Sequence, residues 1–126
     1  MKPQIVLVLV LVAMPFINSV PVPQFGFIRG AFNGAREMYK GYSEMREANW
    51  KNSDKYFHAK ANQNAAKHGP GGIFAAKVIS NGREWVDRNI KGDSRAQSQA
   101  DQRANIYGRN GGDLSRLRPK GLPSKY

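Results

Sequence analysis

The chain has 126 residues, no cysteine and a formal net charge of +11 at pH 7. The lack of cysteine excludes a disulfide framework and a thiol nucleophile, so stability must come from helix packing, self-association or a bound ligand. The positive charge favours an anionic partner. For an exported protein the candidates are glycosaminoglycans, lipid headgroups and microbial surfaces rather than nucleic acid.

The first nineteen residues have the layout of a secretory signal peptide. Lys2 precedes an apolar run from Ile5 to Met14, Pro15 ends that run, and Ser19 is a small residue at the expected cleavage point. The run is too short to span a membrane. We therefore expect residues 1–19 to be removed and residues 20–126 to be secreted as one helical domain.

Prolines at 21 and 23 predict an extended leader before the first helix. Apolar residues then recur every three or four positions from Phe25 to about Asn49, which predicts an amphipathic helix. Four glycines within this segment each lower helix stability by about 1 kcal/mol relative to alanine. The helix is therefore expected to need a surface to pack against.

A turn at residues 49–52 precedes a second helix, which Ser53 or Asn52 would cap and which runs to about His68. Its apolar face contains Tyr56, Phe57, Ala61 and Ala65. The segment Gly69–Gly72 is expected to end this helix and form a tight turn. A third helix follows from about Ile73 to Gly92. Its expected apolar stripe contains Phe74, Val78 and Trp85, with Ile79, Val86 and Ile90 beside it. Its expected charged side contains Lys77, Arg83, Glu84, Asp87, Arg88 and Lys91.

Ser94 and Gln97 form a capping-box pattern for a shorter fourth helix that ends at Gly108. The tail, from about Arg109, has no periodic pattern and is either disordered or laid over the helices as an ordered wrap. Apolar residues that favour the ordered wrap are Leu114, Leu117, Leu122 and Tyr126. No segment alternates as a strand, so the sequence predicts an all-α fold.

The sequence shows no pattern typical of a catalytic or metal site. His58 and His68 are ten residues apart, with no carboxylate placed beside them in the way that metal ligands usually have. The segment Gly69–Gly72 lacks the Lys-Ser/Thr ending of a phosphate-binding loop. We predict that the protein is not an enzyme and binds no metal or cofactor. The aromatic stripe of the first helix is either core or a lipid-binding face, and the positive charge is either a solvated face or an anion-binding one.

Several segments, in order along nearly the whole chain after the leader, resemble the serum amyloid A family. They are residues 31–39, 42–49, 53–59, 64–72, 100–105 and 118–126. The resemblance implies a secreted acute-phase apolipoprotein with a four-helix bundle and an irregular C-terminal tail packed over it. It further implies self-association, transport on high-density lipoprotein, binding of retinol-like lipids and heparan sulfate, and amyloid formation. The chain departs from the family pattern at residues 60–63, at Phe74 and Trp85, and over residues 89–96.

We predict that lipid contact is made by apolar side chains of the first and third helices. These side chains are Phe25, Phe27, Ile28, Phe32, Met38, Phe74, Val78 and Trp85. Without lipid, the same faces are expected to be buried between helices and subunits. Heparin or another anion is expected to bind a basic set in a salt-dependent way. This set is Arg83, Arg88, Arg116, Arg118 and Lys120, and the resemblance implies a ligand contact at Arg83.

A second interpretation stays open. A cationic amphipathic helix does not distinguish lipid carriage from membrane disruption. The chain could therefore be a cationic host-defence or cytokine-like protein that binds bacterial surfaces or cell receptors. The prolines at 21 and 23 also predict slower fibril formation than in typical relatives, because proline cannot donate a hydrogen bond to a β-ladder.

Overall fold

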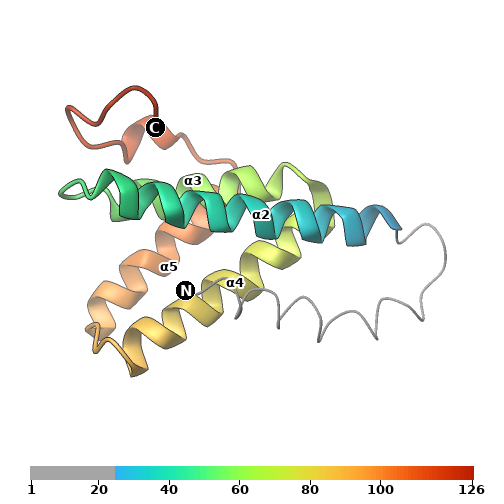
Figure 1. Cartoon of the computed structure of the whole chain (residues 1–126). Coiled ribbons are helices and arrows are strands. Elements are labelled where there is room, and N and C mark those ends of the chain that lie inside the picture. Colours follow the sequence, from blue (N-terminus) through green and yellow to red (C-terminus); the bar gives the residue numbers. More distant parts are fainter. Residues whose placement is uncertain (1–24) are drawn as a thin grey trace.

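The computed structural model describes residues 25–126, and within them it contains four α-helices, a short 3₁₀ helix and an irregular tail (Figure 1). The elements are α2 (Phe25–Ala48), α3 (Asp54–Ala66), α4 (Gly69–Asn89), α5 (Arg95–Arg109) and η2 (Leu114–Arg116). The predicted all-α class is confirmed, since residues 25–126 contain no strand. None of the described helices is both long and apolar enough to cross a membrane. The predicted signal peptide and the two leader prolines lie outside the described residues.

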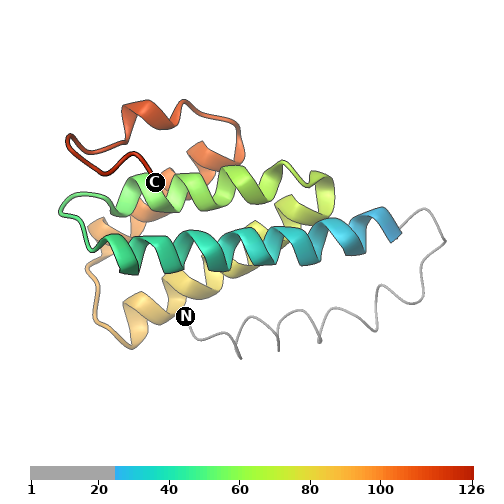
Figure 2. The same cartoon turned by 45° about the horizontal axis from the view of Figure 1, so that its top comes forward.

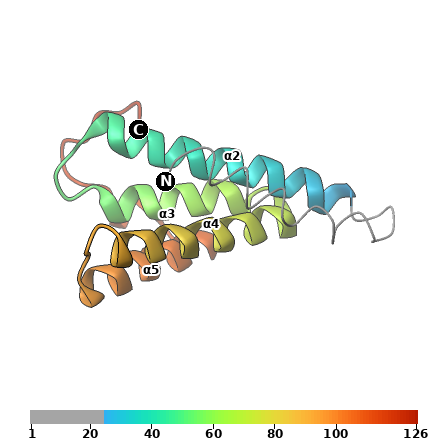
Figure 3. The same cartoon turned by 60° about the horizontal axis from the view of Figure 1, so that its bottom comes forward.

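Helix α3 is the centre of the helical arrangement. It runs antiparallel to α2, and α4 and α5 form a second antiparallel pair (Figures 1 and 3). α3 packs against each of the other three helices and also contacts η2, whereas α2 packs mainly on α3 and α4. Side chains that α3, α4 and α5 direct inward are therefore brought together although they are far apart in sequence.

The main apolar core lies between α2, α3 and α4 and is built mostly from small side chains. It consists of Ala31, Ala35, Met38, Tyr42, Ala61, Ala65, Ala75, Ala76 and Ile79. Small residues allow the helix backbones to approach closely. A Cβ atom at Gly71 would lie 1.9 Å from the carbonyl oxygen of Phe27, and one at Gly34 would lie 2.7 Å from the Cα of Gly72. Gly30 and Gly34, which weaken α2 as an isolated helix, thus permit its contact with α4.

Most predicted helix ends agree with the structure, but the start of α4 does not. The segment Gly69–Gly72 forms the first turn of α4 instead of a separate turn. Pro70 is suited to this position, because the first helical N–H groups lack an acceptor within the helix. Ser94 caps α5 as predicted, its hydroxyl oxygen accepting a hydrogen bond from the Gln97 amide at 3.1 Å. Ser53 precedes α3 but donates its hydroxyl to the Trp50 carbonyl instead of capping the helix.

The prediction for the buried face of α4 is wrong. Phe74 and Trp85 of the expected stripe are exposed and only Ile79 beside it is buried, whereas Arg83, Glu84 and Asp87, expected on the charged side, are buried. Helix α5 likewise buries polar residues, including Ser98, Asp101 and Asn105. These groups are partly paired, through Arg83 with Asp87 within α4, Glu84 with Ser98 between α4 and α5, and Asp101 with Lys55 between α5 and α3, which offsets part of the cost of removing them from water.

The tail forms an ordered wrap, as one of the two sequence alternatives predicted (Figure 2). Leu122 is buried against Tyr56 and Phe57 of α3, and Leu114, Leu117 and Tyr126 pack around the same cluster. Arg118 fixes this arrangement. Its guanidinium donates to the Tyr56 hydroxyl at 2.9 Å and to the Leu122 and Pro123 carbonyl oxygens at 2.9 and 2.8 Å.

Candidate functional site

Helices α2 and α4 carry large apolar side chains that the described fold leaves in contact with solvent. Phe32 is 43% exposed, Phe74 42% and Trp85 61%. Ile28, Phe32 and Tyr39 follow one another at the same spacing as Phe74, Val78 and Trp85, and each set lies on one side of its helix. We call these six residues, together with Phe27, the apolar surface.

Phe27 and Phe74 join the two halves of this surface, with ring centroids 5.5 Å apart. Phe27, Ile28 and Val78 are half-buried. Helix packing within the described chain does not cover Phe32, Phe74 and Trp85, so the expectation that the helices bury them is wrong. Burial between subunits stays a prediction.

The structure does not place two of the predicted lipid contacts, Met38 and Phe25, on the apolar surface. Met38 is fully buried in the core between α2, α3 and α4, so it does not belong to the apolar surface. Met38 has the helical spacing expected of a lipid-facing residue, so the sequence alone could not show that it belongs to the core. Phe25 is the first residue of α2, and its side chain lies outside what the structure describes.

The predicted basic set is divided by the fold. Arg83 is buried, with its guanidinium 4.5 Å from the centre of the Tyr42 ring and its Nε 3.4 Å from Asp87. Arg118 is committed to the tail contacts described above. Neither is an exposed cation, which corrects their placement in an anion-binding surface. Arg88, Arg116 and Lys120 are exposed.

These three exposed cations do not form one patch. Arg116 and Lys120 belong to the tail, whereas Arg88 lies near the C-terminal end of α4. The two segments lie on opposite sides of the helices (Figures 1 and 2). Any anion bound by all three would have to extend around the molecule.

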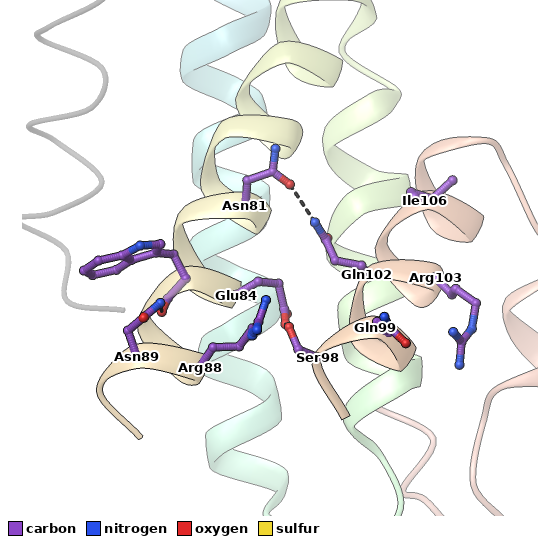
Figure 4. Close-up of a pocket in the computed structure, with 10 residues that line it drawn as sticks. Asn81, Glu84, Arg88, Asn89, Ser98, Gln99, Gln102, Arg103 and Ile106 are labelled. Carbon is purple, nitrogen blue, oxygen red and sulfur yellow. Dashed lines mark hydrogen bonds between the residues drawn. The ribbon is translucent and has the colours of Figure 1, made fainter. Parts of the chain in front are cut away.

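The sequence did not predict the groove of about 480 Å³ that opens between α4 and α5 (Figure 4). Trp85 and Ile106 contribute apolar surface to it. Its polar lining consists of Asn81, Glu84, Arg88, Asn89, Ser98, Gln99, Gln102 and Arg103. Asn81 and Gln102 connect the two helices through a 2.7 Å hydrogen bond.

A buried polar network lies between α3, α4 and α5. Asn62, fully buried, donates to the His58 carbonyl oxygen at 2.8 Å and to Asn105 Oδ1 at 2.9 Å. Asn62 Oδ1 accepts from Ser80 at 3.1 Å and from Arg109 at 2.9 Å. Apart from the bond to His58 within α3, these hydrogen bonds join residues far apart in the sequence, so no local pattern predicts them.

Titratable side chains gather at one edge of that network. Burial lowers the pKa of His58, which favours the neutral imidazole, although Asp101 opposes this shift. Burial, and secondarily Asp101, raises the pKa of Glu84 to about 7. Burial raises the pKa of Tyr42 to about 12. The prediction that no carboxylate lies beside the two histidines is wrong, because Asp101 lies 3.9 Å from His58 and Glu37 lies 3.7 Å from His68.

Comparison with known proteins places the chain among close relatives. The family model described as serum amyloid A protein matches residues 25–126. The serum amyloid A-5 protein of Mesocricetus auratus is 54% identical over 102 residues, which are 81% of this chain and 99% of the relative. The serum amyloid A-3 protein of Mus musculus is 48% identical over 126 residues, all of both chains. The matched region contains the apolar surface, the groove and the buried network.

Proposed function

Because the chain belongs to the serum amyloid A family of acute-phase proteins, we propose that it is a secreted apolipoprotein whose apolar surface binds phospholipid and high-density lipoprotein. The observation that carries the proposal is the exposure of Phe32, Phe74 and Trp85 on two adjacent helices. Exposed apolar side chains at helical spacing are the feature by which a helix inserts into the boundary between headgroups and acyl chains. The free energy of insertion comes from removing this apolar area from water.

The fold supports binding without a large rearrangement. The core of α2 is made by Ala31, Ala35, Met38 and Tyr42, whereas Phe32 and Tyr39 point away from it. Lipid can thus contact the apolar surface while the helices keep their packing. Retinol-like small lipids and a second copy of the chain are proposed to use the same surface, so lipid binding and self-association compete.

The exposed cations give the proposed anion contacts. Arg88, Arg116 and Lys120 are available to lipid headgroups and heparan sulfate, and their contribution should weaken as salt concentration rises. Arg83 and Arg118 are left out of the proposed contacts, because both are held by partners within the fold.

Vesicle flotation of the Phe32→Asp variant tests the proposal. A charge within the apolar surface should oppose insertion and weaken vesicle binding at least about tenfold, with apparent self-association reduced as well. The matched control is Trp50→Asp in the turn after α2, because Trp50 is 38% exposed but lies outside the apolar surface. The control should float like the unchanged protein.

Equal flotation of the two variants would contradict the proposed surface, and lost flotation with unchanged self-association would separate the two roles. The same vesicles can carry a trapped dye. Stable binding without dye release fits carriage, whereas dye release at physiological salt would favour the cationic membrane-active alternative.

A further inference from the structure

Three titratable side chains from three different helices meet inside the molecule. They are His58 of α3, Glu84 of α4 and Asp101 of α5, and their exposed fractions are 3%, 4% and 4%. One potential metal-ligand atom of each lies within 4.8 Å of those of the other two. This cluster is buried beneath the groove that Trp85 also lines, and it plays no part in the proposed lipid binding.

The hydrogen bonds around His58 leave one ring nitrogen directed at a carboxylate. Asn105 Oδ1 accepts from Asn62, so it is a carbonyl oxygen, and it lies 3.1 Å from His58 Nδ1. His58 Nδ1 must therefore carry the proton of the neutral ring. The bare Nε2 lies 3.9 Å from Asp101 Oδ2. A histidine held through Nδ1–H by an oxygen, with Nε2 free to bind, is the usual arrangement of a metal-ligating histidine.

The two carboxylates are incompletely paired. Asp101 Oδ1 accepts from Lys55, and Glu84 Oε2 accepts from the Ser98 hydroxyl at 3.1 Å. Glu84 Oε1 is buried and has no hydrogen-bond partner within residues 25–126. The neighbouring Arg83 pairs with Asp87 through Nε, one of its terminal nitrogens is buried without a partner among the described residues, and its single charge is shared by Asp87 and Glu84. Buried carboxylates without a sufficient countercharge are costly, and a bound cation removes that cost.

We propose that His58 Nε2 and one carboxylate oxygen each of Glu84 and Asp101 bind a zinc ion. One imidazole and two carboxylates form a ligand set that suits zinc, whereas calcium and magnesium prefer oxygen ligands alone. Zinc–ligand bonds of about 2.1 Å require the three atoms to approach one another by roughly 1 Å. Side-chain rotations provide such a movement, and Lys55, whose side chain is 36% exposed, can turn toward solvent.

The groove between α4 and α5 gives the ion a route to the cluster. Glu84 and Ser98 line both the groove and the cluster (Figure 4). The bound ion would connect α3, α4 and α5, so it would also raise the melting temperature, and the rise would grow with the logarithm of zinc concentration above the dissociation constant.

Calorimetric titration of the EDTA-treated protein with zinc chloride at pH 7.5 tests the proposal. We expect one ion per chain. Glu84→Gln should weaken binding at least about tenfold, because it removes a charged ligand while its amide oxygen can still accept from Ser98. The matched control is His68→Gln, since His68 forms a second histidine–carboxylate pair, 3.7 Å from Glu37, near the surface. Circular dichroism should show equal helix content in all three proteins.

The absence of stoichiometric binding, unchanged affinity in Glu84→Gln, or loss of binding in His68→Gln would overturn the proposal. A second measurement avoids mutation. In the unchanged protein, zinc should shift the Nε2 nitrogen resonance of His58 and leave that of His68 in place, and the reverse result would contradict the site.

Discussion

At the scale of single residues, Glu84 shows how far burial departs from what a sequence suggests. It stands among charged residues that a helical pattern places toward solvent, yet its side chain is 4% exposed. Asp101 and Asp87 face it with the same charge, and Arg83 opposes them. The consequence is a carboxyl group whose ionisation destabilises the folded chain.

Replacing Glu84 with Gln should change the pH dependence of stability when a chelator is present. The folded protein keeps Glu84 protonated up to about pH 7, whereas the unfolded chain ionises it near pH 4.5. The stability that the unchanged protein gains from protonated Glu84 is therefore fully present below pH 4.5, and it is lost as the pH rises through about 7. Glu84→Gln should raise the free energy of unfolding by on the order of 2 kcal/mol at pH 8 and change it little at pH 4. Urea denaturation at both pH values measures the difference, and equal effects at both would refute it.

Individual functional residues were the least predictable feature. The sequence placed Phe32, Phe74 and Trp85 on helical stripes correctly, but a stripe alone does not tell core from surface. Met38 follows the same spacing as Phe32 and is buried, because it faces the junction of three helices. Arg83 is buried for a similar reason, because its guanidinium points toward Tyr42 and Asp87 inside the fold.

At the scale of helices, the contact between α2 and α4 depends on the absence of side chains. The first turn of α4 lies against the backbone of α2, with Gly71 directly at Phe27 and Ala31. This contact sets the spacing of the helices that carry the apolar surface.

Gly71→Ala should therefore destabilise the protein. The added Cβ would lie 1.9 Å from the Phe27 carbonyl oxygen, and backbone atoms on both helices would have to move. We expect a loss of about 2–3 kcal/mol, typical of overpacking. Gly26→Ala is the matched control, because its Cβ meets nothing within 4 Å and alanine favours the helix. Thermal unfolding should give a lower melting temperature for the first variant alone, and a stable Gly71→Ala protein would disprove the close contact.

The helices themselves were largely predictable, because periodicity and capping are local. The ends of α2 and α3 and the Ser94 cap of α5 follow from neighbouring residues. The start of α4 was misplaced because Gly69–Gly72 resembles a turn locally, whereas the packing of Gly71 and Gly72 against α2 and the end of α3 favours helix. The polar face of α5 was missed for the same reason, since its partners lie on α3 and α4.

At the scale of the whole molecule, the tail connects the end of the chain to the central helix. Leu122 is its buried contact, and Arg118 holds the loop around it through hydrogen bonds. The sequence was compatible with either a disordered tail or an ordered wrap. Four apolar residues in an aperiodic segment do not show whether the helices offer a surface for them to pack on. Tyr56 and Phe57 on α3 supply that surface, and the tail buries them.

Leu122→Ala should lower the free energy of unfolding by about 2–4 kcal/mol, the usual effect of truncating a buried leucine. Lys120→Ala is the control, since Lys120 is exposed two residues away and should change stability by less than about 0.5 kcal/mol. Chemical denaturation compares them. A Leu122→Ala protein as stable as the control would mean that the tail contributes nothing to the fold.

The central claim is that the apolar surface of α2 and α4 contacts lipid while the fold persists. The two tryptophans allow a direct test, because Trp85 belongs to that surface and Trp50 lies in the turn after α2. In the Trp50→Phe variant, Trp85 fluorescence should shift to shorter wavelength when phospholipid vesicles are added, with helix content retained. Trp85 emission that stays unchanged while the protein floats with the vesicles would contradict the account.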